Sequence, residues 1–172
     1  MKTGTKSLLW GCHQFILHPL FVYIAWIKLY KKRPNWKEAL CIFVHDWGYW
    51  GVEKMESKEG DNHPEWAAIK VWDMLEENYY SYLCLYHSRF YSERADCQPS
   101  KLCWADKIGT ALYPVWLWVV MAWLSGEGEE YMHERKYDSI MGDKKERDTL
   151  PSFFKRYRKV VLEKWSKMGD VV

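Results

Sequence analysis

The chain has 172 residues, a formal net charge of +2, 48% apolar residues and 28% charged residues. This balance excludes a disordered or low-complexity protein, and the length suffices for one domain with a buried core. Aromatic residues make up 17% of the chain, which predicts a core packed with large rings; an exposed aromatic patch is the alternative.

Cysteine usage indicates the redox compartment. The five cysteines form an odd set with no CxxC pair, most have apolar neighbours, and no secretory signal precedes them. Free buried thiols of this kind are typical of a reducing compartment, so a cytoplasmic protein is expected.

Basic clusters occur at two places and adjoin helical patterns. They comprise Lys31, Lys32 and Arg33, and later Lys155, Arg156, Arg158 and Lys159. A solvated helix face explains such clusters better than nucleic-acid binding, so no nucleic-acid polymer is expected as a partner.

The first half of the chain predicts helices and a loop. Pro19 can open a helix because its missing N–H is not needed in the first turn, and apolar residues at helical spacing follow to Lys31. Asn35 with Glu38 predicts a capping box for a helix that ends near His45 and Asp46. A glycine-containing charged loop follows, and Asn62 with Glu65 predicts a second capping box.

The second half continues the helical pattern, and strand signals are nearly absent. An apolar segment leads to His87, and a helix follows through Leu102 and Asp106. Residues 125–130 mark a glycine-rich break, residues 136–149 form a polar segment, and a basic amphipathic helix runs from Pro151 to about Met168. The sequence therefore predicts an all-α helical bundle whose last helix docks on the rest.

Two apolar stretches invite comparison with membrane spans. His18 and Pro19 interrupt the first, and the second, from Ala111 to Leu124, is short of the roughly 20 residues that cross a bilayer. Both are interpreted as buried helices, so no membrane span is expected. For the second, packing at a homo-oligomer interface or on a membrane surface is the alternative.

Polar residues beside apolar segments point to a metal site. The candidates are His18, His45, Asp46, His63, His87 and Asp106. Buried together without a cation, two carboxylates would repel one another and each imidazole would need its own partner. Imidazoles and carboxylates that converge from several helices are how helical bundles hold metal ions.

The order His, His-Asp, His, His, Asp resembles the HD superfamily of metal-dependent phosphohydrolases over about residues 13–115. The motifs that carry the resemblance are "HPLFVYIA" with His18, "HDWG" with His45 and Asp46, "HPEWAA" with His63, "YHSRF" with His87, and "ADK" with Asp106. It implies an HD-type metal-binding helical domain over residues 1–125. Residues 126–172 would then form a polar segment and an amphipathic helix packed on the same domain.

The resemblance also implies roles for these residues. One divalent metal ion would be held by His18, His45, Asp46 and Asp106, and in members with two ions a second would be held by His63 and His87, with Asp46 bridging. Two such ions about 3.5–4 Å apart can activate a water and neutralise a phosphoryl group. A nitrogen and oxygen ligand set suits Fe, Mn, Co, Ni or Zn. His13 is the competing first-helix histidine, but it lacks the downstream match to the motif.

One position departs from the family pattern. Many phosphodiesterase members carry a lysine three residues after the aspartate of the pair, and Tyr49 stands there in this chain. This disfavours hydrolysis of cyclic dinucleotides and requires another cation for phosphate recognition. Arg89 and Lys107 are the candidates, because either could reach a phosphate oxygen. A surface cation is the alternative for each.

The function expected from the resemblance is hydrolysis of a nucleotide or related phosphoester, with Asp46, Arg89 and Lys107 as catalytic residues. The spacing from His87 to the "ADK" segment is similar to the dinucleoside polyphosphate hydrolase branch, and nucleoside monophosphates and deoxynucleotides fit equally well. The alternatives are an HD-type diiron oxygenase and a non-catalytic metal-binding regulatory module.

Overall fold

Helices form the secondary structure of this protein. The computed structural model describes residues 1–133 and 149–168, with side chains to residue 164, and this part of the chain contains no strand. In chain order the elements are α1 (Thr3–Trp10), α2 (Leu17–Tyr30), α3 (Trp36–Val44), the 3-10 turn η1 (Trp47–Tyr49), α4 (Lys58–Asp61), α5 (His63–Leu75), α6 (Asn78–Leu85), α7 (Arg89–Arg94), α8 (Lys101–Leu112), α9 (Val115–Ser125), α10 (Glu127–His133) and α12 (Leu150–Met168). The predicted all-α class is confirmed.

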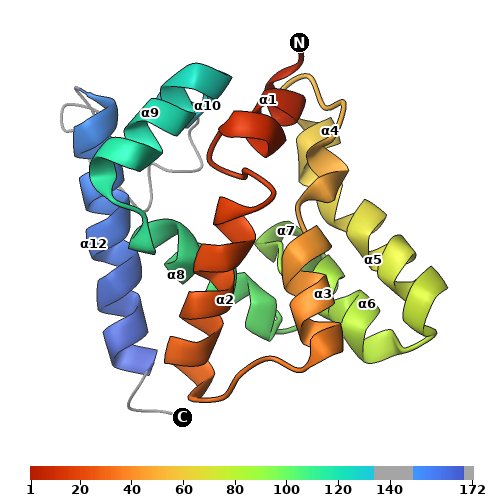
Figure 1. Ribbon diagram of the computed structural model, residues 1–172. Coiled ribbons are helices and arrows are strands. Elements are labelled where there is room, and N and C mark those ends of the chain that lie inside the picture. The colour runs from red at the N-terminus through yellow and green to blue at the C-terminus, as the bar shows by residue number, and fades with distance from the viewer. Residues whose placement is uncertain (134–148, 169–172) are drawn as a thin grey trace.

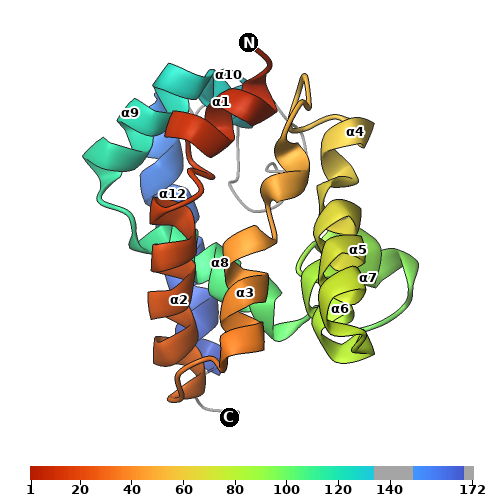
Figure 2. The same cartoon turned by 45° about the vertical axis from the view of Figure 1, so that its right-hand side comes forward.

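Two groups of buried apolar side chains hold the helices together. The first lies among α2, α3, α5, α6 and α8 and includes Val22, Trp26, Ile42, Val71 and Leu102. The second lies among α9, α10 and α12 and includes Tyr113, Trp118, Met121, Phe153 and Phe154. Figure 1 places α12 and α5 on opposite sides of the group formed by α2, α3 and α8, and in the turned view of Figure 2 α12 lies behind α2.

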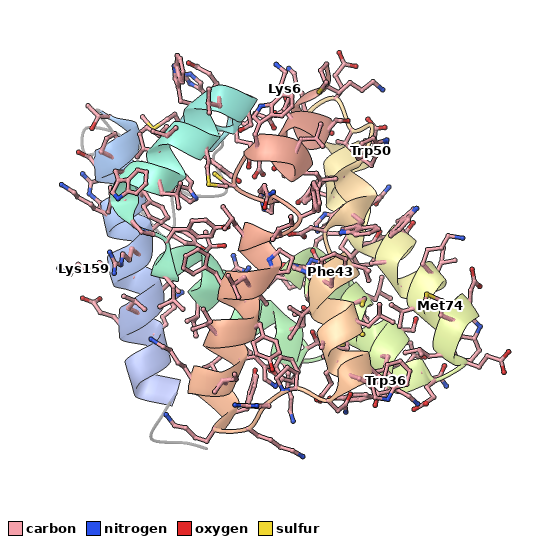
Figure 3. All side chains as sticks on the ribbon, in the orientation of Figure 1. Lys6, Trp36, Phe43, Trp50, Met74 and Lys159 are labelled. Carbon is pink, nitrogen blue, oxygen red and sulfur yellow. The ribbon has the colours of Figure 1, made fainter. Side chains whose placement is uncertain are left out.

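The last helix docks through stacked rings. The rings of Trp118 in α9 and Phe154 in α12 lie 4.2 Å apart between centroids and are nearly parallel, at 6°. Phe153 and Phe154 are both buried, whereas Lys159 projects from α12 into solvent (Figure 3). The amphipathic pattern of this helix therefore follows its packing. The polar segment predicted at residues 136–149 lies outside the described residues except for Thr149.

Helix α2 begins two residues before the predicted start. Gln14 explains the difference, because its Oε1 accepts hydrogen bonds from the backbone N–H groups of Ile16 (2.8 Å) and Leu17 (2.6 Å). These groups have no partner inside the helix, and a side-chain oxygen satisfies them. Pro19 therefore lies within the first turn, and His18 is already helical and fully buried.

The two predicted capping boxes have different outcomes. The first is confirmed, since Asn35 accepts from the N–H groups of Lys37 and Glu38 while Glu38 accepts from the N–H of Asn35. The second is wrong: Asn62 precedes α5 but makes no side-chain capping bond. The Tyr91 hydroxyl lies 3.0 Å from Asn62 Oδ1 and 2.6 Å from Glu65 Oε1, so both side chains face a tertiary partner instead. The predicted loop before α5 also contains a helical turn, α4.

The second apolar stretch is only half-buried, which corrects its interpretation as a buried helix. Pro114 separates α8 from α9, and the two helices meet at a bend of 103°. Trp118 packs inside, but Trp116 and Trp123 are 69% and 74% exposed. Among the described helices none alone is long and apolar enough to cross a membrane; α8 and α9 together meet that test by length and composition only.

Other aromatic side chains also lie on the surface rather than in the core. Trp36, Phe43 and Trp50 are exposed, and Figure 3 shows Trp50 near the edge of the molecule, as it does the exposed side chain of Met74. The prediction of a core packed with aromatic rings is therefore correct for some of these residues. The others are exposed on the surface.

A close approach between α2 and α8 sets the spacing of the candidate site. A Cβ atom on Gly109 would lie 2.8 Å from the backbone nitrogen of Val22 and 2.9 Å from its Cα. Because these are backbone atoms, a side chain at this position requires the helices to separate. His18 in α2 and Asp106 in α8 approach one another across the same contact, at 3.0 Å between Nε2 and Oδ1.

Gly109→Ala is therefore expected to lower the free energy of unfolding by about 1–3 kcal/mol, as overpacked cores do. Metal affinity should fall with it, because His18 and Asp106 move apart. Urea denaturation and metal titration measure the two effects. Lys101→Ala, at an exposed position in the same helix, is the control. A Gly109→Ala protein with wild-type stability and wild-type metal affinity would show that the helix spacing is not critical.

Candidate metal centre

Four of the predicted residues converge from three helices and one turn. They are His18 in α2, His45 at the end of α3, Asp46 before η1, and Asp106 in α8, and one possible ligand atom from each lies within 4.8 Å of the others. His18 Nε2 lies 3.2 Å from Asp46 Oδ2 and 3.0 Å from Asp106 Oδ1. His45 Nε2 lies 3.2 Å from the same Asp46 oxygen. These four residues are called the first group below.

The other two predicted histidines form a second group with Asp46. His63 is the first residue of α5 and His87 lies between α6 and α7, and their Nε2 atoms are 3.1 Å apart. Each of these nitrogens lies 3.5 Å from Asp46 Oδ1. Asp46 therefore presents Oδ2 to the first group and Oδ1 to the second, which is the arrangement of a bridging carboxylate.

Backbone carbonyls orient three of the imidazoles. His45 Nδ1 donates to the carbonyl of Ile42 (2.8 Å), and His63 Nδ1 donates to that of Gly60 (2.7 Å). His87 Nδ1 donates in the same way to Cys84. A carbonyl oxygen only accepts, so the proton of each neutral ring is on Nδ1 and the Nε2 lone pair faces the cluster. This is how proteins orient histidines that bind metal ions.

The burial of the cluster leaves polar atoms that a cation could satisfy. His18, His45 and His87 are buried, and Asp46 is only 5% exposed. His45 Nε2, Asp46 Oδ2 and both ring nitrogens of His18 have no well-aligned hydrogen-bond partner among the described residues. The lone pairs of His63 and His87 also face one another across 3.1 Å. A metal ion would satisfy these atoms together, so the residues present fit one.

The electrostatics of the cluster agree with this fit. Burial opposes the ionisation of Asp46, but His45, His13 and the contacts from His18 outweigh it and hold the pKa of this carboxyl well below its ordinary value. Burial lowers the pKa of His63 to about 4, although Asp46 opposes the shift. Near neutral pH, therefore, Asp46 is ionised and His63 keeps its lone pair for a metal ion.

Metal binding is expected to release a proton. Burial opposes a charge on His45, yet Asp46 and Asp106 outweigh it and raise its pKa to about 10 in the metal-free protein. Below that pH the ring carries a proton on Nε2 that a metal ion must displace. Affinity should therefore increase about tenfold per unit of pH between roughly pH 6 and pH 9.

Calorimetric titration with zinc in buffers of different ionisation enthalpy measures the released protons. The expected result at pH 7 is the release of about one proton from His45 with the first ion. The same enthalpy in every buffer, with an affinity that does not change with pH, would contradict a role for His45 as a ligand.

A cavity of about 500 Å³ opens beside the cluster, and its lining includes Trp118 and Phe153 from the second group of core residues. Asp46, His63, His87 and Asp106 line it. Arg89, the first residue of α7, and Lys107 line the same cavity, so the structure brings both predicted cations to the space next to the cluster. Phe90, Trp104 and Tyr157 add aromatic walls.

Tyr49, which stands at the sequence position where many phosphodiesterase members carry a lysine, packs against the cluster. Its ring stacks on His63, with 3.9 Å between centroids and 17° between planes. It also lines the cavity. Burial raises the pKa of this phenol well above its ordinary value, and Asp46 and Asp106 raise it further. Tyr49 is therefore neutral and supports His63, and it does not replace the missing lysine as a cation.

A pair that the sequence analysis missed lies next to the cluster, with the His13 ring centroid 5.3 Å from that of His18. Glu127 is buried, and its Oε2 lies 3.1 Å from Nδ1 of His13. His13 lines the cavity but is not a member of either group, in agreement with the choice of His18 as the first-helix candidate. Nothing local in the sequence distinguishes Glu127 from Glu129 and Glu130, which are less buried.

Comparisons with protein-family models, with curated proteins and with solved structures find no match for this chain. The resemblance to the HD superfamily thus remains a prediction from the ordered motifs. The structure establishes the coarser statement: the protein is all-α in its described part and contains a buried cluster of histidines and aspartates that could hold a metal ion.

Proposed function

We propose that this chain is a metal-dependent phosphohydrolase that acts on a nucleotide or related phosphoester. The observation that carries the proposal is the cavity, because it joins a cluster suited to metal ions with the two cations Arg89 and Lys107. An anionic group is the ligand that both parts favour. Cavities of a few hundred cubic ångströms are typical of small-molecule sites.

The first group would hold one ion, and His63 and His87 would hold a second, with Asp46 shared between them. Bound ions supply Lewis acidity, which lowers the pKa of a water and neutralises charge on the phosphoryl group. The guanidinium of Arg89 can form a bidentate hydrogen bond to phosphate oxygens, whereas Lys107 acts as a point charge. The buried carboxylate of Asp46 would bind both ions, because one of its oxygens faces His45 in the first group and the other faces His63 in the second.

The aromatic wall favours a substrate with a flat apolar part. Phe90 and Trp104 lie in the same cavity as Arg89 and Lys107. A nucleoside bound with its phosphate at the cations can stack its base on such rings. Nucleoside monophosphates, deoxynucleotides and dinucleoside polyphosphates all have these two parts, so a nucleotide is the substrate class proposed.

Metal analysis of the purified protein, followed by a phosphate-release screen with added Mn and Co, tests the proposal. The screen covers the three nucleotide classes named above. Arg89→Ala should raise KM at least about tenfold, since a charged hydrogen bond contributes about 1.5–3 kcal/mol. Arg33→Ala, at an exposed arginine in the loop before α3, is the control.

Three results separate the alternatives. Phosphate release that depends on metal and on Arg89 supports the hydrolase. Iron with substrate-dependent oxygen consumption and no phosphate release would support the diiron oxygenase instead. A fully metal-loaded protein that binds nucleotides but turns over none of them would identify a regulatory module.

A further inference from the structure

Glu127 is a buried carboxylate with a full set of hydrogen-bond donors. It is 1% exposed at the start of α10. Its Oε1 accepts from the backbone N–H of Cys12 and from the hydroxyl of Ser125, each at 2.8 Å. Its Oε2 accepts from the hydroxyl of Tyr131 at 2.8 Å and faces His13 Nδ1 at 3.1 Å. A buried carboxylate held by four groups has one orientation, so it fixes the group that it faces.

His13 is that group, and it belongs to the cavity of the metal cluster. Nδ1 of His13 lies 3.1 Å from Oε2 of Glu127 and 2.9 Å from the hydroxyl oxygen of Ser7. A carboxylate only accepts hydrogen bonds, so Nδ1 carries a proton, which it shares between Glu127 and Ser7. The ring centroid lies 5.3 Å from that of His18 and 5.2 Å from that of Tyr49. Within the described residues, the hydrogen bonds of His13 involve its backbone N–H and Nδ1. Nε2 is therefore the ring nitrogen that can form a hydrogen bond to a molecule in the cavity.

Hydrolysis of a phosphoester with a basic leaving oxygen needs such a group. A water oxygen forms the new bond to phosphorus, and the bond from phosphorus to the leaving oxygen breaks with its electron pair on that oxygen. When that oxygen belongs to a sugar, as in a nucleoside monophosphate, it must then receive a proton. Among the imidazoles in the described lining of the cavity, His63 and His87 direct Nε2 at Asp46, and the arginine and lysine side chains hold their protons more strongly than imidazole does. His13 is the remaining imidazole.

We propose that His13 is a catalytic residue that gives the Nε2 proton to the leaving oxygen, and that Glu127 is its positioning residue. The proposal rests on the proposed phosphohydrolase function. The proton balance is complete, because the attacking water loses a proton that returns to His13 through solvent in each cycle. The pairing of histidine with a buried carboxylate through Nδ1 gives the ring one orientation and stabilises its charged form.

His13→Asn tests the catalytic role. Asparagine keeps an N–H where Nδ1 stood but has no second nitrogen, so the contact with Glu127 is preserved. Turnover of a nucleoside monophosphate, whose leaving oxygen is that of the sugar, should fall about 10²–10⁴-fold, which is the usual contribution of a general acid. Turnover of p-nitrophenyl phosphate should fall less than about tenfold, because nitrophenolate leaves without a proton. The metal content should equal that of the wild type.

Glu127→Gln tests the positioning role. It should reduce nucleotide turnover less than His13→Asn does. Turnover of p-nitrophenyl phosphate should again fall less than turnover of the nucleotide. A second measurement does not depend on activity: imidazole ¹H–¹⁵N spectra should show a hydrogen-bonded Nδ1 proton that is absent in His13→Asn and displaced in Glu127→Gln. His133→Asn and Glu129→Gln alter an exposed pair, 3.5 Å apart, and are the matched controls.

The outcomes are distinct. An equal loss on both substrates, no loss on either, or a lower metal content in His13→Asn would overturn the proposal. An unchanged Nδ1 proton in a folded Glu127→Gln protein would overturn the role of Glu127. If the wild type itself hydrolyses neither substrate when loaded with metal, the phosphohydrolase function fails, and the role of His13 fails with it.

Discussion

Asp46→Ala is expected to abolish activity and to lower metal content more than any other single replacement in this chain. Asp46 is the one residue common to both groups, with Oδ2 at 3.2 Å from His45 Nε2 and Oδ1 at 3.5 Å from His63 Nε2. Its loss removes a ligand from each proposed ion. Metal affinity should fall more than about 100-fold, since even residues that only support a ligand contribute 10–100-fold.

Elemental analysis and turnover of the loaded protein measure these effects. Asp73→Ala is the matched control, because Asp73 is exposed and pairs only at the surface with Lys70, at 3.5 Å. Far-UV circular dichroism of both variants shows whether the fold survives. Full turnover of Asp46→Ala with unchanged metal stoichiometry would show that the bridging role is wrong.

His63→Ala and His87→Ala should each reduce bound metal from about two ions to about one. These residues meet at Nε2 atoms 3.1 Å apart, and the first group does not include either of them. The fold should survive, because His18, His45 and Asp106 still surround the remaining ion together with Asp46. Catalysis should fall steeply, since the reaction loses one of its two Lewis acids.

Metal analysis of both variants beside the wild type decides between one ion and two. His133→Ala, at an exposed histidine, is the control and should retain the wild-type metal content. If wild type and variants all bind one ion, His63 and His87 are cavity residues that hold no ion. That result would leave a mononuclear phosphohydrolase and would rule out the diiron oxygenase.

Local interactions are the part of this structure that the sequence predicts well. The capping box of Asn35 and Glu38 forms as expected, because its partners lie within one turn of helix. The amphipathic helix α12 also forms, since apolar spacing along 19 residues reports directly on one buried face. The four histidines and two aspartates of the cluster were recognisable for a different reason: they lie beside apolar segments, and polar groups buried there require partners.

The tertiary structure decides what depends on residues far apart in the chain. Asn62 and Glu65 face the hydroxyl of Tyr91 instead of capping α5, and Trp116 and Trp123 stay exposed because the second core covers only one side of α9. Likewise, only the tertiary structure shows that one carboxylate oxygen of Asp46 faces the first group and the other faces the second.

The pair of His13 and Glu127 shows the same limit most clearly. Its members are 114 positions apart, and no local pattern marks either of them. The sequence alone determined the helical class, the cap at Asn35 and the residues suited to a metal ion, because these follow from spacing and from the cost of burying polar groups. Only the tertiary structure decided which imidazoles share an aspartate and which one faces a buried glutamate, because packing between distant helices sets those distances.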